Sequence, residues 1–185
     1  MKTCALYGFG LTLTSAVLTL ILYLTGFHSN VDKFFIGLCL GFILGLSAVI
    51  LFLILGIKAQ RAKGGTAAGF SYGKALLSGL MVTAFAAIFS VPFNYLYFGF
   101  INWDYTETTI AWTTRLMEKG NVPQSRIDEA ADKMRQRSTP LRQTTSGAIA
   151  ALVGGAIVSL IVAGVMKREP AESLPSELPD PTRTA

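Results

Sequence analysis

Cysteine, histidine and charged side chains are all scarce in this sequence. It contains two cysteines and one histidine, and charged residues make up 15% of it, against about 25% in an average soluble domain. Two cysteines exclude a disulfide framework, and with one histidine no metal site built mainly from Cys and His can form within one chain. Hydrophobic residues make up 51% of the sequence. This composition excludes a disordered chain and favours a protein that lies in a lipid bilayer.

The charged residues that are present avoid four long apolar runs. These runs contain no Asp, Glu, Lys, Arg or His, and they cover residues 5–26, 34–57, 75–101 and 146–166. Each reaches the roughly 20 residues that a helix needs to cross a bilayer, and none alternates like a membrane strand. We therefore predict an all-α fold, a polytopic membrane protein whose four transmembrane helices form a bundle. This domain covers residues 1–168, and the proline-rich, acidic residues 169–185 are predicted to be a disordered tail.

The stretch between the third and fourth runs, residues 102–143, is too long for an unstructured loop in a compact fold. We predict two short helices there. The first covers residues 104–118 and continues the third span, and the second opens at a capping box formed by Ser125 and Asp128. The second helix has an apolar face that includes Ile127. We expect this face to dock on the first helix or on the membrane surface.

Basic residues crowd the connection between the second and third runs. They are Lys58, Arg61, Lys63 and Lys74, with no acidic residue among them. Such clusters mark the cytoplasmic side, so we predict that this connection and both termini face the cytoplasm and that residues 102–143 lie outside. The same four side chains are predicted to contact anionic lipid head groups. The net charge of +5 does not indicate nucleic-acid binding, because the basic residues act as topology signals and have no aromatic stacking platform beside them.

Small residues recur every fourth position in two of the predicted spans. The second span has Gly37, Gly41 and Gly45, and the fourth has Gly147, Ala151, Gly155 and Ser159. This spacing places each set on one helical face, where the small side chains let two backbones approach closely. We predict that both stripes are helix-packing faces within the chain. A glycine-lined passage or the seam of a homodimer remains an alternative.

The third span contains a proline and an asparagine near its end. Pro92 removes one backbone donor and clashes with the carbonyl of Ile88, which predicts a kink or a local widening of the helix. The freed carbonyl is expected to be satisfied by Ser90 or by a neighbouring helix. Asn94 is the most polar side chain within the four runs. We expect it to make an interhelical hydrogen bond or to lie at the interface, and the alternative is that it lines a polar cavity.

The sequence offers little for catalysis or ion coupling. No ionisable side chain lies within the four runs, whereas a proton- or sodium-driven transporter usually carries one there. His28, the only histidine, lies in a short connection where we expect a structural or solvated role. We therefore predict a protein that is not an enzyme, with no catalytic, cofactor-binding or metal-binding residues and no cofactor.

Several short motifs recur in an order typical of one family. They are Tyr7 and Gly8, residues 70–75, residues 102–105, Gly120, Ile127, Met134, and residues 138–141. In order and spacing they resemble a bacterial family known as domain of unknown function 4199, whose members are small four-helix proteins of the inner membrane. The resemblance implies this fold and a bacterial inner-membrane location. That family has no assigned activity, so no functional residue carries over.

These observations predict a non-enzymatic structural or accessory component of the membrane. Its expected partners are membrane lipids, a second copy of the chain or another membrane protein. The alternative function is a small oligomeric channel or transporter. A shared cavity lined by Pro92, Asn94 and the glycine stripes favours the alternative, whereas dry mutual packing of these residues favours the accessory role.

Overall fold

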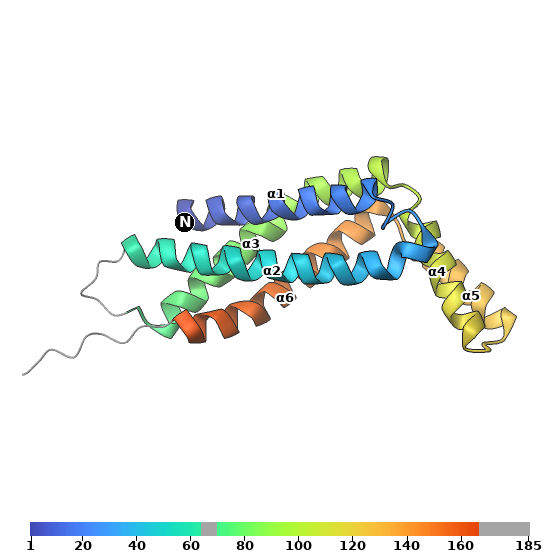
Figure 1. Cartoon of the computed structure of the whole chain (residues 1–185). Helices are drawn as coiled ribbons and strands as arrows, with labels where there is room; N and C mark the ends of the chain where they lie inside the picture. Colours follow the sequence, from blue (N-terminus) through green and yellow to red (C-terminus); the bar gives the residue numbers. More distant parts are fainter. Residues whose placement is uncertain (64–69, 167–185) are drawn as a thin grey trace, which may run out of the picture.

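The computed structural model describes residues 1–63 and 70–166, and within them the chain is helical almost throughout (Figure 1). The helices are α1 (Lys2–Leu24), α2 (Val31–Lys63), α3 (Tyr72–Leu96), the π-helical segment η1 (Tyr97–Ile101), α4 (Tyr105–Lys119), α5 (Gln124–Arg137) and α6 (Pro140–Met166). This confirms the predicted all-α fold. The predicted disordered tail, residues 169–185, lies outside the described residues.

Four of these helices are long and apolar enough to cross a membrane: α1, α2, α3 with η1, and α6. The chain is therefore a multi-pass membrane protein. All four helices begin before the predicted runs, and α2 also ends beyond its run, because these helices include polar residues that flank the runs. Helix α6 begins at Pro140, where the missing backbone donor costs nothing, and the Thr139 side chain accepts a hydrogen bond from the Arg142 backbone at 3.3 Å. At the start of α3, the Ser71 side chain likewise accepts a hydrogen bond from the Lys74 backbone N–H.

The four spans run side by side, α1 and α3 in one direction and α2 and α6 in the other (Figure 1). Helix α3 packs against both α1 and α6, and α1 packs against α2. We call the end that holds Met1 the N-terminal end, and the end that holds α4 and α5 the hairpin end. The main apolar core lies toward the N-terminal end, where Leu53, Ile57, Val82 and Ala163 are fully buried.

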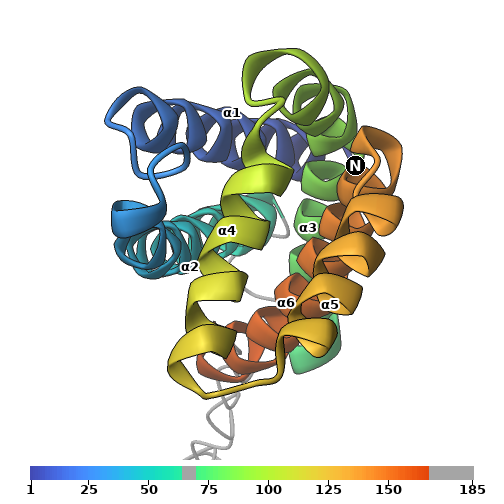
Figure 2. The same cartoon turned by 90° about the vertical axis from the view of Figure 1, so that its right-hand side faces the viewer.

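Helices α4 and α5 form an antiparallel pair that lies across the hairpin end (Figure 2). The buried side chain of Ile127 faces the interior of this part, as the predicted docking requires. The predicted capping box is wrong: α5 starts one residue before Ser125, and its N-cap, Pro123, makes no side-chain hydrogen bond. The Asp128 carboxylate instead accepts a hydrogen bond from Gln124 at 3.0 Å. A fixed proline conformation, rather than a polar cap, sets this helix start.

The third span widens near its end, after Pro92 and not at it. The α-helix continues through Pro92 to Leu96, and the widening occurs in η1, where the Asn102 backbone donates to the Tyr97 carbonyl at 2.7 Å. Ser90 donates to the Ala87 carbonyl at 2.8 Å and not to that of Ile88. The chain then leaves helical conformation before Asp104, so α4 is a separate helix and does not continue the third span as predicted.

Candidate functional site

A cavity of about 390 Å³ lies between the four spans. Every span contributes to its wall. The lining residues are Leu11, Thr12, Ser15, Ala16 and Thr19 from α1; Gly41, Phe42, Gly45, Leu46 and Val49 from α2; Thr83, Ala86, Ala87, Ser90, Phe93 and Asn94 from α3; and Gly147, Ala151, Gly154, Gly155 and Val158 from α6. The volume lies within the range of about 300–1,000 Å³ that is usual for small-molecule sites, and such sites often lie between the helices of a bundle.

Much of this space lies beside small residues that have no neighbouring helix packed against them. A Cβ atom placed on Gly45, Gly147 or Gly154 would find nothing from the rest of the described chain within 4 Å. Toward the N-terminal end, by contrast, large side chains such as Leu53 and Ile57 fill the bundle. The spans are therefore closely packed in one half and separated by a cavity in the other half.

The two predicted packing stripes divide between these roles. Gly37 lies against the backbone of Phe27, and a Cβ there would be 2.7 Å from that residue's carbonyl oxygen. Gly155 packs against Thr83, with a corresponding distance of 2.5 Å to Cγ2.

The other residues of the two stripes also either pack closely against another helix or line the cavity. Ser159 is fully buried and lies against Gly79 of α3. Gly41, Gly45, Gly147 and Ala151 line the cavity, as Gly155 also does. One sequence pattern thus serves both close packing and the cavity wall.

The polar side chains of the lining fall into two groups. In the first group, Thr12, Thr83 and Ser90 donate hydrogen bonds to the backbone carbonyls of Ala86, Leu80 and Ala87, at 3.0, 3.0 and 2.8 Å respectively. Ser15, Thr19 and Asn94, in contrast, make no side-chain hydrogen bond to any residue that the structure describes. Their polar atoms are open to the cavity.

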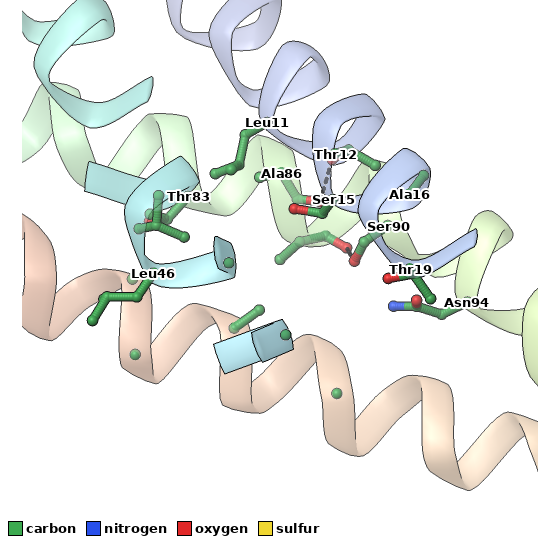
Figure 3. Close-up of a pocket in the computed structure, with 18 of the residues that line it drawn as sticks. Leu11, Thr12, Ser15, Ala16, Thr19, Leu46, Thr83, Ala86, Ser90 and Asn94 are labelled. Carbon is green, nitrogen blue, oxygen red and sulfur yellow. Dashed lines mark hydrogen bonds between the residues drawn. The ribbon is translucent and has the colours of Figure 1, made fainter. Parts of the chain in front are cut away.

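Asn94 and Thr19 lie side by side at one end of the cavity, with Ser15 and Ser90 on the same wall (Figure 3). This is the end nearer to α4 and α5, because Thr19 and Asn94 both lie late in spans that run toward the hairpin. The lining contains no Asp, Glu, Lys, Arg or His. Pro92 is not part of it. The site therefore offers unbonded neutral polar groups toward one end, and elsewhere mainly apolar surface with the hydroxyls of Thr12 and Thr83 already bonded to backbone carbonyls.

A second cluster of polar and aromatic residues lies at the hairpin end, beyond Asn94. Tyr97 is its centre and is only 2% exposed. The Asn102 side chain donates to the Tyr97 hydroxyl at 3.0 Å, and that hydroxyl lies 2.7 Å from His28 Nδ1. Because the hydroxyl oxygen accepts from Asn102, its one proton can be donated to His28, whose Nδ1 then acts as the acceptor. Burial lowers the pKa of His28, which favours the neutral ring that this arrangement needs.

The cluster also closes the cavity at this end. The ring of Phe93, which lines the cavity, stacks on Tyr97 with the ring centroids 6.0 Å apart. Tyr105 of α4 contacts both His28 and Phe34 at centroid distances of 6.0 and 5.8 Å, and burial raises the pKa of its phenol. The sequence predicts a structural or solvated role for His28 and does not identify its partners. The only signal for them was the aromatic segment 102–105 that contributes to the family resemblance.

The predicted lipid-contacting residues lie together at the N-terminal end. Lys58, Arg61 and Lys63 are in the last turns of α2, and Lys74 is in the first turn of α3. Lys63 also donates to the Thr3 side chain, which ties the end of α2 to the start of α1.

Several charged side chains at the hairpin end form ion pairs. Arg135 binds both carboxylate oxygens of Glu107 at 3.0 Å, and this hydrogen bonding lowers the pKa of Glu107. Arg115 pairs with Asp32, and Lys133 pairs with Glu129 as their spacing of four residues allows. Residues 104–137 hold six basic and six acidic side chains, so the hairpin is close to neutral overall.

The fold and the cavity define a class, that of multi-pass α-helical membrane proteins with a ligand-sized space inside the bundle. The chain belongs to the family described as "Protein of unknown function (DUF4199)", whose sequence model matches residues 6–168. This confirms the resemblance found from the sequence motifs. Neither a search of curated proteins nor a search of solved structures found a match.

Proposed function

We propose that this protein is a non-enzymatic accessory component of the membrane whose bundle holds a small amphipathic molecule. The observation that carries the proposal is the cavity, with Ser15, Thr19 and Asn94 open to it and without a side-chain hydrogen bond to any described residue. The three side chains are half-buried, and a polar group that faces an apolar environment without a hydrogen bond is costly, so we expect them to bind a partner that is not part of the chain. The aliphatic remainder of the lining suits the apolar part of the same molecule.

A channel or transporter is the competing function, because Asn94 and the glycines share one cavity. A channel needs a passage that opens at both membrane faces. Here the cavity ends at the fully buried Leu53 and Val82 on one side and at the Phe93–Tyr97 stack on the other. These two closures support a binding role over conduction.

The test is to fill the cavity and measure what remains bound. Leucine at Gly154 has room to enter the cavity, whereas leucine at Gly164, which also lies in open space on α6, points outside the lining. Native mass spectrometry of the full chain, extracted from its own membrane in mild detergent, should detect a bound lipophilic molecule on the wild type and on Gly164→Leu. Gly154→Leu should lose at least nine-tenths of it. Equal occupancy in all three proteins, or none in the wild type, would overturn the proposal.

We further propose that the N-terminal end faces the cytoplasm of a bacterial inner membrane, where the four basic residues of α2 and α3 contact anionic lipid. The balance of charge in the hairpin supports this orientation, since residues 104–137 hold six basic and six acidic side chains, whereas residues 58–74 hold four basic and no acidic ones. The outer faces of the spans then remain available to lipid, to a second copy or to another membrane protein.

Cysteine labelling tests this orientation. In a background with Cys4→Ala and Cys39→Ala, a cysteine replaces either Ser125 of α5 or Ala62 of α2, both of which are exposed. A membrane-impermeant maleimide added to intact cells should label the Ser125 position and reach the Ala62 position only after permeabilisation. The reverse pattern would invert the proposed topology.

A further inference from the structure

We propose that the occupant of the cavity is a single-chain lipid with an uncharged, hydrogen-bonding head group, such as a fatty alcohol or a monoacylglycerol. Its head lies at Thr19 and Asn94, and its chain points toward the N-terminal end. This inference rests on the proposed binding function and adds to it the chemistry and the direction of the ligand.

The head group is identified by the polar end of the cavity. Asn94 offers both an amide donor and a carbonyl acceptor, and Thr19 beside it offers a hydroxyl (Figure 3). A hydroxyl on the ligand can donate to one of these groups and accept from another. A carboxylate or an ammonium group would meet no counter-charge, because the lining has no ionisable side chain. Burial of an unpaired charge is far more costly than burial of a neutral polar group, so the site selects an uncharged head.

The chain is identified by the rest of the lining and by the volume. Away from Asn94 the wall is mainly apolar, with Leu11, Val49 and Val158 leading to the closely packed core. The hydroxyls of Thr12 and Thr83 in this part are bonded to backbone carbonyls. The volume of about 390 Å³ lies near the lower end of the range for small-molecule sites. It accommodates one chain more readily than a two-chain phospholipid.

The entrance faces the bilayer and not the water. The lining residues of α2 and α6 that remain exposed include Phe42, Leu46, Ala151 and Gly154, so the cavity is accessible between these two helices. The hairpin end, in contrast, is closed by the buried Tyr97 and the rings around it. A molecule that enters between α2 and α6 comes directly from the hydrocarbon region, which favours a membrane lipid over a water-soluble ligand.

Three probes with chains of equal length separate the head-group requirement from simple hydrophobic binding: hexadecan-1-ol, palmitate and hexadecane. The full chain in detergent should bind hexadecan-1-ol at least tenfold more tightly than either of the others. Asn94→Leu and Thr19→Val should lower its affinity toward that of hexadecane, and they should leave hexadecane binding unchanged. Thr14→Val is the matched control, because Thr14 lies on α1 outside the lining, and it should change no affinity.

The outcomes distinguish the inference of an uncharged head group from the proposed binding function on which it rests. If palmitate or hexadecane binds as tightly as the alcohol and Gly154→Leu still removes the binding, the neutral-head inference is wrong and the binding function stands. If none of the probes binds, or Gly154→Leu has no effect on them, both are wrong. In a Cys4→Ala, Cys39→Ala background, a disulfide between two chains that carry Ala151→Cys, formed in the native membrane, would show that a second copy fills the opening and would also overturn the lipid assignment.

Discussion

Replacement of Tyr97 by alanine is expected to lower the free energy of unfolding by about 3–5 kcal/mol, the loss typical of removing a large buried aromatic side chain. Tyr97 is 2% exposed and contacts rings from several segments, among them Tyr23 of α1 and Phe93 of α3. Its removal leaves a space where α1, α3 and the α1–α2 connection meet. It also leaves the buried Asn102 amide without its acceptor.

Two further variants separate the ring from the hydroxyl. Tyr97→Phe keeps the packing and removes the group that joins His28 to Asn102, so it should cost about 1–3 kcal/mol, as expected for buried polar groups left without a partner. Tyr95→Ala is the control, since Tyr95 lies on the same span and is 45% exposed. Denaturant titration of the purified protein in mixed micelles measures all three. If Tyr97→Ala and Tyr95→Ala cost the same, the cluster does not stabilise the hairpin end.

The spans could be predicted from the sequence because a bilayer imposes a simple rule. A helix that crosses it must present a long uncharged run, and the four runs match the four helices found. The ends could not be predicted as well, since basic and polar residues continue α2 to Lys63 without interrupting its hydrogen bonding. The start of α5 was missed for a related reason. Ser125 satisfies a capping pattern, but Pro123 determines where that helix begins.

The cavity could not be predicted because small residues permit two opposite outcomes. Gly155 and Gly147 belong to the same stripe of α6, yet one packs against Thr83 and the other has open space beside it. The difference depends on whether the opposing helix approaches, which is a property of the whole bundle. The pairing of His28 with Tyr97 is hidden for the same reason, since a contact across 69 positions leaves no local pattern.

The second prediction with a large expected effect on stability concerns the contact between α1 and α3, in the closely packed half of the bundle. A Cβ atom on Gly8 would lie 2.7 Å from Phe85 Cβ, 2.8 Å from the Val82 carbonyl oxygen and 2.9 Å from the Ala86 nitrogen. Two of these atoms belong to the backbone, so a side-chain rotation cannot relieve the clash and the helices must separate. Gly8→Ala should therefore destabilise the protein by about 1–3 kcal/mol, as overpacking typically does.

Separation of the two helices at Gly8 should also break a nearby hydrogen bond, and this gives a second way to test the prediction. Thr12, one turn further along α1, donates to the Ala86 carbonyl at 3.0 Å, and this bond holds only while α1 and α3 stay close. Thr12→Val should therefore cost less in the Gly8→Ala background than in the wild type, a coupling that a double-mutant cycle measures directly. Gly164→Ala is the control, because Gly164 has open space around it and alanine favours the helix by about 0.5–1 kcal/mol. Equal stabilities for Gly8→Ala and Gly164→Ala, or additive costs for Gly8→Ala and Thr12→Val, would mean that α1 and α3 are not held together at this contact.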